Sequence, residues 1–595
     1  MKNSSHKFFT NWIEGAMCFS RRLSREGSGP PLRRVVCGDL DAKCFSSFLA
    51  DEEALQTARP QTGATGGQET RRVQRTFKCF IASLFLFCCV IVPPAHAGSN
   101  VPRNVVMLSA GVVNLTLLGT IIWKATHKAS SHATPNYQMS PNSPEAILLE
   151  KLSDSSPTIP FHHGIKTFSG AALRQYLQET GEEPTAIATY LHQQEEKHSR
   201  FEIKGVGGYH YLLSPNRPVP GVTGSINPFL TEQEGMFSED GHNGFVGADL
   251  RGAIVPSLTF EAEPLALASS HSAGTQKNTQ FYLKRGSLLW SPKQLEIEIG
   301  KESVQWGFGR QGTMTFSGNA ESFYLFRVGN STPVTLPGFL HYLGPTRTDF
   351  FITFLDANRE FPYSILHGMK TTFLPHPRWE IGFGQSMQFG GEGSGSWSPL
   401  NYFADDWTGS GNNKVNRNFV VDTRWRIPKL EIEPYAELYW EDCCDAVVIN
   451  PRDTLNLFGL YFPNIGVDGK ADFAAEWVRT NGITYRHSGY SSGFFYKGHG
   501  IGHPIGPDGT GIYGIFRYFY TPTLFGKVVT AFEQRGRLQE ASPEDRYRIN
   551  LSLYQEIHSH VRLTWDAGYE RVTRFNFQAN TGRDNFMAGL QLELL

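Results

Sequence analysis

The chain has 595 residues, a formal net charge of −1 and 19% charged residues. This near-neutral balance excludes a strongly basic protein that would bind nucleic acid or an acidic membrane surface through net charge alone. A mean hydropathy of −0.31 excludes a bundle of apolar transmembrane helices. It allows a transmembrane β-barrel, because the strands of such a barrel alternate apolar and polar residues. The 60 glycines and 13% aromatic residues suit a β-rich protein with many turns.

Residues 1–97 are predicted to be a leader that ends in a signal peptide at 71–97. Positively charged residues precede an apolar run at 80–92, and Ala95-His96-Ala97 matches the small-residue cleavage signature. We therefore expect export and cleavage after Ala97. The stretch before residue 71 shows no apolar periodicity and is interpreted as the result of a start codon assigned too far upstream, with a cytoplasmic extension as the alternative.

The N-terminal segment 98–200 holds an apolar run and a small helical region. The run at 105–123 is long enough to cross a bilayer as a helix. A retained span would hold the protein in the inner membrane, whereas a buried helix or a membrane-proximal anchor is compatible with a barrel, and the sequence leaves these interpretations open. Apolar residues recur with helical spacing at 146–152 and 171–196, so we expect periplasmic helices before the barrel.

From residue 201 to residue 595 the apolar period is two, which predicts a large antiparallel β-barrel. The clearest hairpin turns at Pro428-Lys429, with Ile427 expected opposite Leu430 and Arg424 opposite Glu433. One face of this hairpin is apolar and carries Trp425 and Trp440; the other is a ladder of opposite charges. Strands of about 9–11 residues suit a membrane crossing better than a soluble sandwich.

The same alternation recurs on both sides of a short turn at 558–560, and the chain ends on a strand. Counting such segments gives roughly 16–20 strands, enough for a wide polar lumen. Because these barrels have short periplasmic turns and long external loops, we expect the turns at 428–429 and 558–560 in the periplasm. The segments 388–418 and 442–454 are then expected outside the cell.

Several short motifs follow one another in a fixed order along this region. They are Ile299-Gly300-Lys301, Val304-Gln305-Trp306-Gly307-Phe308-Gly309, Phe316-Ser317-Gly318-Asn319-Ala320, Phe389-Gly390-Gly391-Glu392-Gly393, Tyr439-Trp440-Glu441-Asp442 and the run from Tyr496 to Asp508. In this order the motifs resemble those of the Wzi family of capsule assembly proteins, and the resemblance covers about residues 150–595.

This resemblance implies an all-β outer-membrane barrel of about 18 strands, preceded by a small periplasmic helical region, in a Gram-negative bacterium. It also implies a lectin-like function, in which exported capsular polysaccharide is bound and anchored to the cell surface without turnover. The expected partners are therefore a capsular or extracellular polysaccharide and outer-membrane lipid, with no nucleic acid, and we expect a monomer. The alternative is an outer-membrane channel for a small polar solute.

The sequence offers little that points to catalysis, a cofactor or a metal, and we expect none of these. Gly307–Gly312 spells G-x-G-x-x-G, but the chain continues as β and lacks the following acid, which favours a turn or a barrel bend over a dinucleotide site. His499 and His503 lie among glycines and prolines, and Asp405-Asp406 has no identifiable partner, so loop or lumen positions are favoured. Cys443-Cys444 is interpreted as two inert thiols, with a strained or intermolecular disulfide as the alternative.

External aromatic and basic residues are the candidates for glycan binding, because sugar rings stack on aromatic faces and anionic polymers pair with cations. The competing interpretation is that these residues pack the loop over the barrel mouth or belong to the aromatic girdle, and it is the more common role for such residues. The candidate residues are Trp397, Tyr402, Trp407, Lys414 and Arg417.

Overall fold

The computed structural model describes residues 119–120, 135–155, 159–180, 185–197, 200–213, 217–218, 225–229, 231–236, 240–270, 279–394, 415–441, 454–466, 468–558 and 560–594. In this part of the chain, no helix is both long and apolar enough to cross a membrane. The predicted leader 1–97 and the apolar run at 105–123 lie outside the described residues, apart from Gly119 and Thr120.

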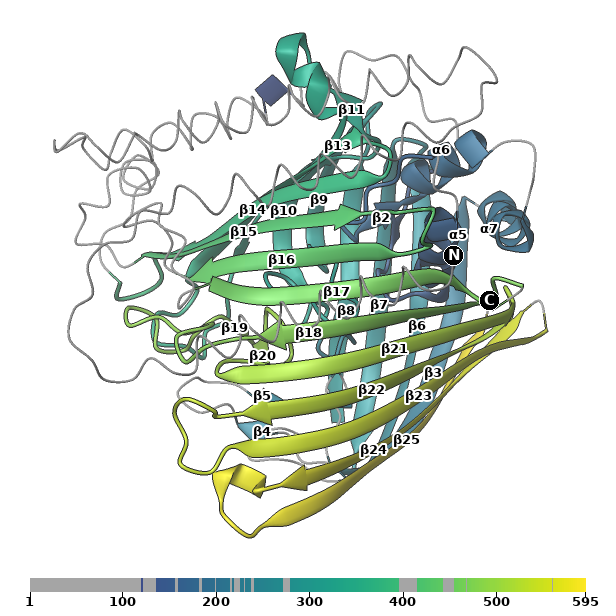
Figure 1. Ribbon diagram of the computed structural model, residues 1–595. Coiled ribbons are helices and arrows are strands. Elements are labelled where there is room, and N and C mark those ends of the chain that lie inside the picture. The colour runs from purple at the N-terminus through teal and green to yellow at the C-terminus, as the bar shows by residue number, and fades with distance from the viewer. Residues whose placement is uncertain are drawn as a thin grey trace, which may run out of the picture. The chain divides into compact units, whose positions relative to one another are not determined.

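Within the described residues, eighteen antiparallel strands close into a barrel, with the two-residue β11 placed beside β12 (Figure 1). Neighbouring strands follow one another along the chain, and β25 pairs with β3 to close the sheet. This confirms the predicted all-β barrel of about 18 strands. The strands are β3 Phe201–Leu213, β6 Gly241–Val255, β7 Leu258–Ser269, β8 Thr279–Trp290, β9 Leu295–Glu302, β10 Phe323–Asn330, β11 Val334–Thr335, β12 Pro345–Phe354, β13 Ile365–His376, β14 Trp379–Phe389, β15 Val415–Trp425, β16 Glu433–Glu441, β17 Thr454–Ile465, β18 Ala471–Arg479, β21 Gly509–Thr521, β22 Leu524–Arg535, β23 Glu544–His558, β24 Val561–Thr573 and β25 Gly582–Leu594.

The remaining elements are short. Within the described residues from 135 onward, three helices precede the barrel, and small two-stranded sheets and two 3-10 turns lie in the connections. They are α5 Pro144–Ser155, α6 Gly170–Thr180, α7 Ala186–Lys197, the pairs β1 Gln138–Met139 with β2 Phe168–Ser169, β4 Arg217–Pro218 with β5 Ser225–Ile226 and β19 Phe495–Tyr496 with β20 His499–Gly500, and the turns η1 Gly338–Leu343 and η2 Phe575–Phe577.

The two faces of the sheet have the polarity that the alternation predicts. On β15 the odd positions face outward, and Trp425 is exposed, whereas Asp422 and Arg424 face the lumen and are buried. On β23 the apolar residues Ile549 and Leu551 are likewise exposed. An apolar outer face around a polar interior is the arrangement that a barrel needs in a bilayer.

The register of the hairpin between β15 and β16 differs from the predicted one by two residues. Ile427 bridges Ile432 rather than Leu430, because the chain turns through four residues, 428–431, with Glu431 in the left-handed conformation at φ 51°. A shift by two keeps every side chain on its predicted face. As a result, Glu433 accepts hydrogen bonds of 2.6 Å from the Nε atoms of both Arg424 and Arg426.

The turns that join β15 to β16 and β23 to β24 lie at the same end of the barrel, as predicted. The helices pack at that end: α5, α6 and α7 share an apolar cluster with Phe519 and Phe525, which flank the β21–β22 turn. Lys151 of α5 donates to the Pro463 carbonyl near the end of β17. The short turns and the helices therefore lie at the same end of the barrel, where β25 also ends (Figure 1), and in outer-membrane barrels the end with short turns generally faces the periplasm.

The helical spacing predicted at 171–196 is divided between two helices. The helix α6 ends at Thr180 and α7 begins at Ala186, with Gly181 and Pro184 between them in the sequence. Glycine after a helix and proline before the next favour termination, and this local signal outweighs the continuous apolar spacing. The Thr185 hydroxyl caps α7 by accepting from the Ala188 N–H at 3.1 Å.

Candidate functional site

Three segments fold into the lumen and fill much of it. They are residues 161–167 after α5, residues 303–322 between β9 and β10, and residues 480–508 between β18 and β21. Their apolar side chains join wall residues in one buried cluster. The cluster includes Ile165, Trp306, Met314, Phe316, Tyr485, Phe494, Tyr496 and Ile501 from these segments, and Leu325, Phe351, Tyr439, Leu457 and Tyr513 from the wall.

Two buried carboxylates of the wall hold the glycine-rich part of the 303–322 loop. Glu437 on β16 accepts hydrogen bonds from the backbone N–H groups of Phe308 and Gly309, each at 2.7 Å, and of Met314 at 2.8 Å. Glu476 on β18 accepts from the next two N–H groups, those of Arg310 and Gln311, at 2.5 and 3.2 Å. Four consecutive backbone N–H groups of the loop, from residues 308 to 311, therefore donate to two carboxylates of the protein's own barrel wall.

Glycine is required where this loop meets the wall. Gly307 has φ 132°, and a Cβ atom there would lie 2.4 Å from a carboxylate oxygen of Glu437. The G-x-G-x-x-G motif therefore lies in the loop that fills the lumen. The sequence favours a turn or a bend of the barrel; the bend is not found, because the motif lies in the lumen and not in a strand of the wall.

A third wall carboxylate holds the segment that follows α5. Glu380 on β14 accepts from the N–H groups of His163 at 2.8 Å and Gly164 at 3.0 Å. The loop 480–508 is held in a similar way, because Glu441 accepts from the Tyr485 N–H at 2.8 Å. All three lumen segments are therefore tied to carboxylates on the inner face of β14, β16 and β18.

The two long inner loops also bind each other. The Tyr485 hydroxyl donates to the Met314 carbonyl at 2.6 Å and accepts from the His503 N–H at 2.9 Å. The Ser317 N–H donates to the Ile501 carbonyl at 2.9 Å. Burial lowers the pKa of His503 to about 3, so this histidine is neutral at physiological pH. His499 and His503 thus have lumen positions, as expected from the sequence.

Ion pairs dock the helix α5 onto the lumen contents and the wall. Glu150 pairs with Arg310 of the inner loop at 2.9 Å and with Arg517 of β21 at 2.5 Å. Asp154 pairs with Arg310 at 3.2 Å and also contacts Arg424. Burial would raise the pKa of Asp154, but Arg424 and the other neighbouring cations hold it well below its ordinary value.

A cavity of about 430 Å³ remains between the helices, the inner loop and the wall formed by β3, β6 and β22 to β25. Its lining mixes both signs of charge, with Lys204, Lys527 and Arg562 near Asp566 and Glu593. Such a lining has no excess of one charge that would select an anion or a cation. The cavity lies in the lumen next to the segments that fill the rest of it.

The comparisons with known proteins agree with this architecture. A family model described as "Capsule assembly protein Wzi" matches residues 216–586. The chain belongs to the Wzi family.

Solved structures show the same fold at low sequence identity. Wzi of Escherichia coli, described as an outer membrane protein involved in group 1 capsule assembly and a carbohydrate-binding β-barrel, is 15% identical with a TM-score of 0.59, and the match covers 78% of this chain and 99% of that one. OccAB2 of Acinetobacter baumannii is 9% identical with a TM-score of 0.40, over 66% and 97%. OccK5 of Pseudomonas aeruginosa is 12% identical with a TM-score of 0.38, over 66% and 96%; these two are too distant to guide an argument. No curated protein gives a significant match.

The family membership and the apolar outer face together make this protein an outer-membrane β-barrel of the capsule assembly class. Of the five residues predicted to bind glycan, only Arg417 lies among the described residues. It is half-buried on β15 and shares the outward face with Phe419, toward the external end of the strand. Trp397, Tyr402, Trp407 and Lys414 lie outside the described residues, between β14 and β15.

Sequence reasoning about this Wzi-family protein missed the wall carboxylates. From the sequence, Glu433 is expected to face Arg424 on the neighbouring strand, and these two residues do pair. No partner is predicted for Glu437. Glu437 binds a loop more than a hundred residues away in the chain. Two features of the sequence could have indicated this contact: Glu437 faces inward with no arginine opposite it, and a glycine-rich segment that could supply backbone N–H groups lies elsewhere in the chain.

We expect Glu437→Ala to destabilise the barrel strongly. The substitution leaves three buried N–H donors without an acceptor, and each such loss costs about 1–3 kcal/mol. The free energy of unfolding, measured by urea titration in detergent micelles, should fall by about 3 kcal/mol or more. Glu392→Ala, at an exposed glutamate outside the barrel wall, is the control; a loss below about 1 kcal/mol in Glu437→Ala would refute the role.

The docking of α5 should depend on acid pH through Glu150. Burial would raise its pKa, but Arg310 and Arg517 lower the pKa to about 2, below the ordinary value of 4.5. Because the folded-state pKa is the lower one, the stabilisation is complete above pH 4.5 and is lost as the pH falls toward 2. Thermal unfolding of wild type and Glu150→Gln, followed by circular dichroism, should give a difference in Tm that shrinks within this window. A difference that stays constant down to about pH 2.5, near the lower end of this window, would contradict the assignment.

Proposed function

We propose that this Wzi-family barrel binds exported capsular polysaccharide at its external end and anchors it to the cell surface without turnover. The family is one of capsule assembly proteins, and the E. coli member with the same fold is described as carbohydrate-binding. The observation that carries the proposal for this chain is the filled lumen, because the inner loops and α5 occupy the path that a transported solute would take.

A filled lumen favours binding at the rim over transport through the barrel. In the described part of the chain, Trp306 and Phe316 are fully buried at the centre of the lumen contents, and Glu437 and Glu476 tie their loop to the wall. A channel for a small solute would need these contacts to break in each passage. A surface-bound polymer needs no such opening.

The polymer contacts are proposed in the long connection between β14 and β15. Trp397, Tyr402 and Trp407 would stack on sugar rings, and Lys414 and Arg417 would pair with acidic groups of the polymer. Arg417 supports this placement in part, since it lies at the external end of β15, although on the outer face of the wall. Repeated weak contacts along one long polymer would retain it through avidity.

The remaining expectations belong to the same proposal. Cleavage after Ala97 would deliver residues 98–595 to the periplasm, and the helices α5 to α7 would close the barrel from that side. The mature protein would function as a monomer in outer-membrane lipid.

The decisive experiment separates cell-bound from released polysaccharide in a deletion strain of the source bacterium. We expect total polymer to stay similar and to shift into the medium, and the wild-type gene to restore retention. Trp407→Ala combined with Trp397→Ala should restore retention only weakly. Trp425→Ala, which removes an exposed tryptophan beside the periplasmic turn, is the matched control and should restore it fully. Unchanged cell-bound polymer in the deletion strain would reject anchoring.

The channel alternative makes a different prediction in planar bilayers. We expect the wild-type protein to show little steady conductance, because the inner loops fill the lumen. Replacing residues 304–321 by a short glycine-serine linker should open a large conductance, since this removes the loop held by Glu437 and Glu476. A wide, steady pore in the wild-type protein would instead support transport.

A further inference from the structure

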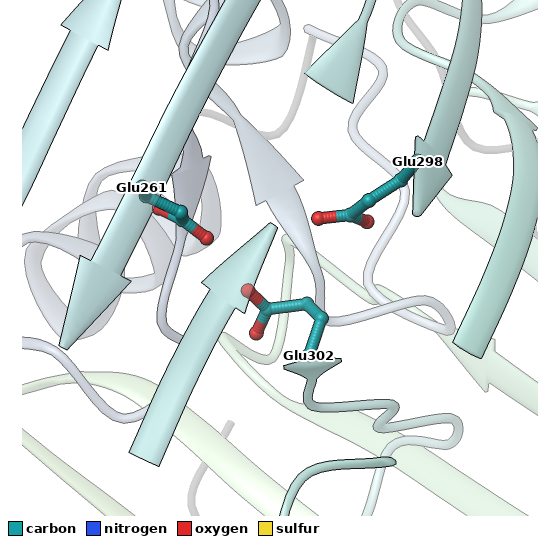
Figure 2. Close-up of side chains that lie close together, drawn as sticks. All are labelled: Glu261, Glu298 and Glu302. Carbon is teal, nitrogen blue, oxygen red and sulfur yellow. The ribbon is translucent and has the colours of Figure 1, made fainter. Parts of the chain in front are cut away.

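Three glutamates from β7 and β9, the strands on either side of β8, meet at one point of the inner wall (Figure 2). Glu261 comes from β7, and Glu298 and Glu302 from β9, and one carboxylate oxygen of each lies within 4.8 Å of those of the other two. All three side chains are buried, with exposed fractions of 8%, 1% and 0%. Three carboxylates converging away from water repel one another unless a positive charge neutralises them.

The strand pairing explains why these acids converge. Glu261 lies opposite Ser287 of β8, and Ser287 lies opposite Gly300 of β9. Alternation puts Glu298, Gly300 and Glu302 on one face, and the glycine adds no side chain between the two acids. Gly300 has φ 149°, and a Cβ atom there would lie 2.4 Å from the Gly286 carbonyl oxygen, so the site requires glycine at this position.

Several carboxylate oxygens of the cluster accept no hydrogen bond from any described residue. Both oxygens of Glu261 and Oε2 of Glu302 are in this state. Figure 2 shows the Glu261 carboxylate directed toward the other two. By contrast, Glu298 accepts from the Ser287 hydroxyl at 2.7 Å and from Arg327 at 3.2 Å. The Glu261 carboxylate thus points toward the other two carboxylates, and neither of its oxygens has a hydrogen-bond donor among the described residues.

The neighbouring arginines do not neutralise the cluster, because each is shared with other acids. Arg285 lies 3.6 Å from Glu302 but also 3.2 Å from Glu263 and 3.7 Å from Glu234. Arg327 pairs with Asp349 at 2.7 Å as well as with Glu298. Arg251 pairs with Asp249 at 2.9 Å. Among the described residues, each of these arginines is therefore shared between the cluster and acids outside it.

We propose that Glu261, Glu298 and Glu302 bind a divalent cation, calcium in preference to magnesium. Calcium takes carboxylate oxygens at about 2.4 Å with variable geometry, so two of its ligand oxygens can lie up to about 4.8 Å apart. The three carboxylate oxygens here all lie within 4.8 Å of one another, so one calcium ion could contact all three. Magnesium demands shorter bonds and retains its waters. No local sequence pattern predicts this metal site, because its ligands come from two strands that only the register of the sheet brings together.

The cation would fix the point where the lumen-filling loop leaves the wall. Glu302 is the last residue of β9, and the Ser303 N–H that follows donates to its Oε1 at 2.8 Å. The ion would therefore join β7 to the base of the 303–322 loop. This function is independent of polysaccharide binding, and its test needs no polymer.

The experiment measures calcium binding to the full-length barrel in non-ionic detergent, after chelation and removal of lipid. Equilibrium dialysis against calcium chloride, with bound metal counted by mass spectrometry, should give about one ion per chain with half-saturation near 10⁻⁴ M. Glu261→Gln/Glu302→Gln should weaken binding at least about tenfold, and calcium should raise the Tm of the wild type alone. Glu263→Gln is the matched control, since both oxygens of this β7 acid are already paired with Lys284 and Arg285; it should bind like the wild type.

Three results would overturn the proposal. Wild-type protein that binds no calcium up to about 10 mM would show that the glutamates are neutralised by protons instead. Equal binding by the wild type and the double variant would place the ion elsewhere, in residual lipid or on the surface. An equal loss in Glu263→Gln would indicate a diffuse charge effect. If the double variant does not fold, as judged by its heat-dependent mobility in gels, the wild-type titration alone decides.

Discussion

The structure depends on buried carboxylates of the barrel wall that accept hydrogen bonds from the backbone of the lumen segments. Glu380, Glu437 and Glu476 lie on alternate strands, and each accepts two or three N–H groups. A buried carboxylate without partners is very costly, and so is a buried N–H. Placing one against the other satisfies both, so an irregular loop can be packed inside the barrel without forming regular secondary structure.

This arrangement gives the interior a specific rather than a generic filling. Apolar residues such as Trp306 and Phe316 provide the hydrophobic surface that folding buries. They do not determine which loop occupies which position in the lumen. The geometry of a carboxylate that accepts consecutive N–H groups does determine it, and it requires glycine at position 307, where the wall approaches within contact distance. Arg310 of the same loop forms ion pairs with Glu150 and Asp154 of α5, so the loop is also fixed to the helix at the end of the barrel.

The sequence predicts features that follow from a short repeat, such as which face of a strand a side chain occupies. It does not predict contacts between residues that lie far apart in the chain. The faces of β15 and β16 follow from alternation, and they survived a register error of two residues at the 428–431 turn because side chains repeat every second position. The division of 171–196 into α6 and α7 was marked by Gly181 and Pro184, yet the apolar spacing concealed it. The contact of Glu437 with Phe308 spans 129 residues, and no local pattern encodes it. The candidate glycan-binding residues cannot be tested against such a pattern, because residues in loops do not recur at a regular spacing.

A filled and cross-linked lumen suits a protein that holds a polymer at its rim. A binding surface loses affinity when its own residues must be ordered on contact, and loops whose bases are fixed lose less. Here the inner loops are tied to β14, β16 and β18, the strands from which the external connections also depart. If the polymer binds the external connections as proposed, this rigidity of the strands would lower the entropic cost of each weak contact. A polymer that makes many such contacts would gain from the reduction at every one. An interior that must open for transport would lose this advantage, so the same carboxylates that close the lumen favour retention over passage.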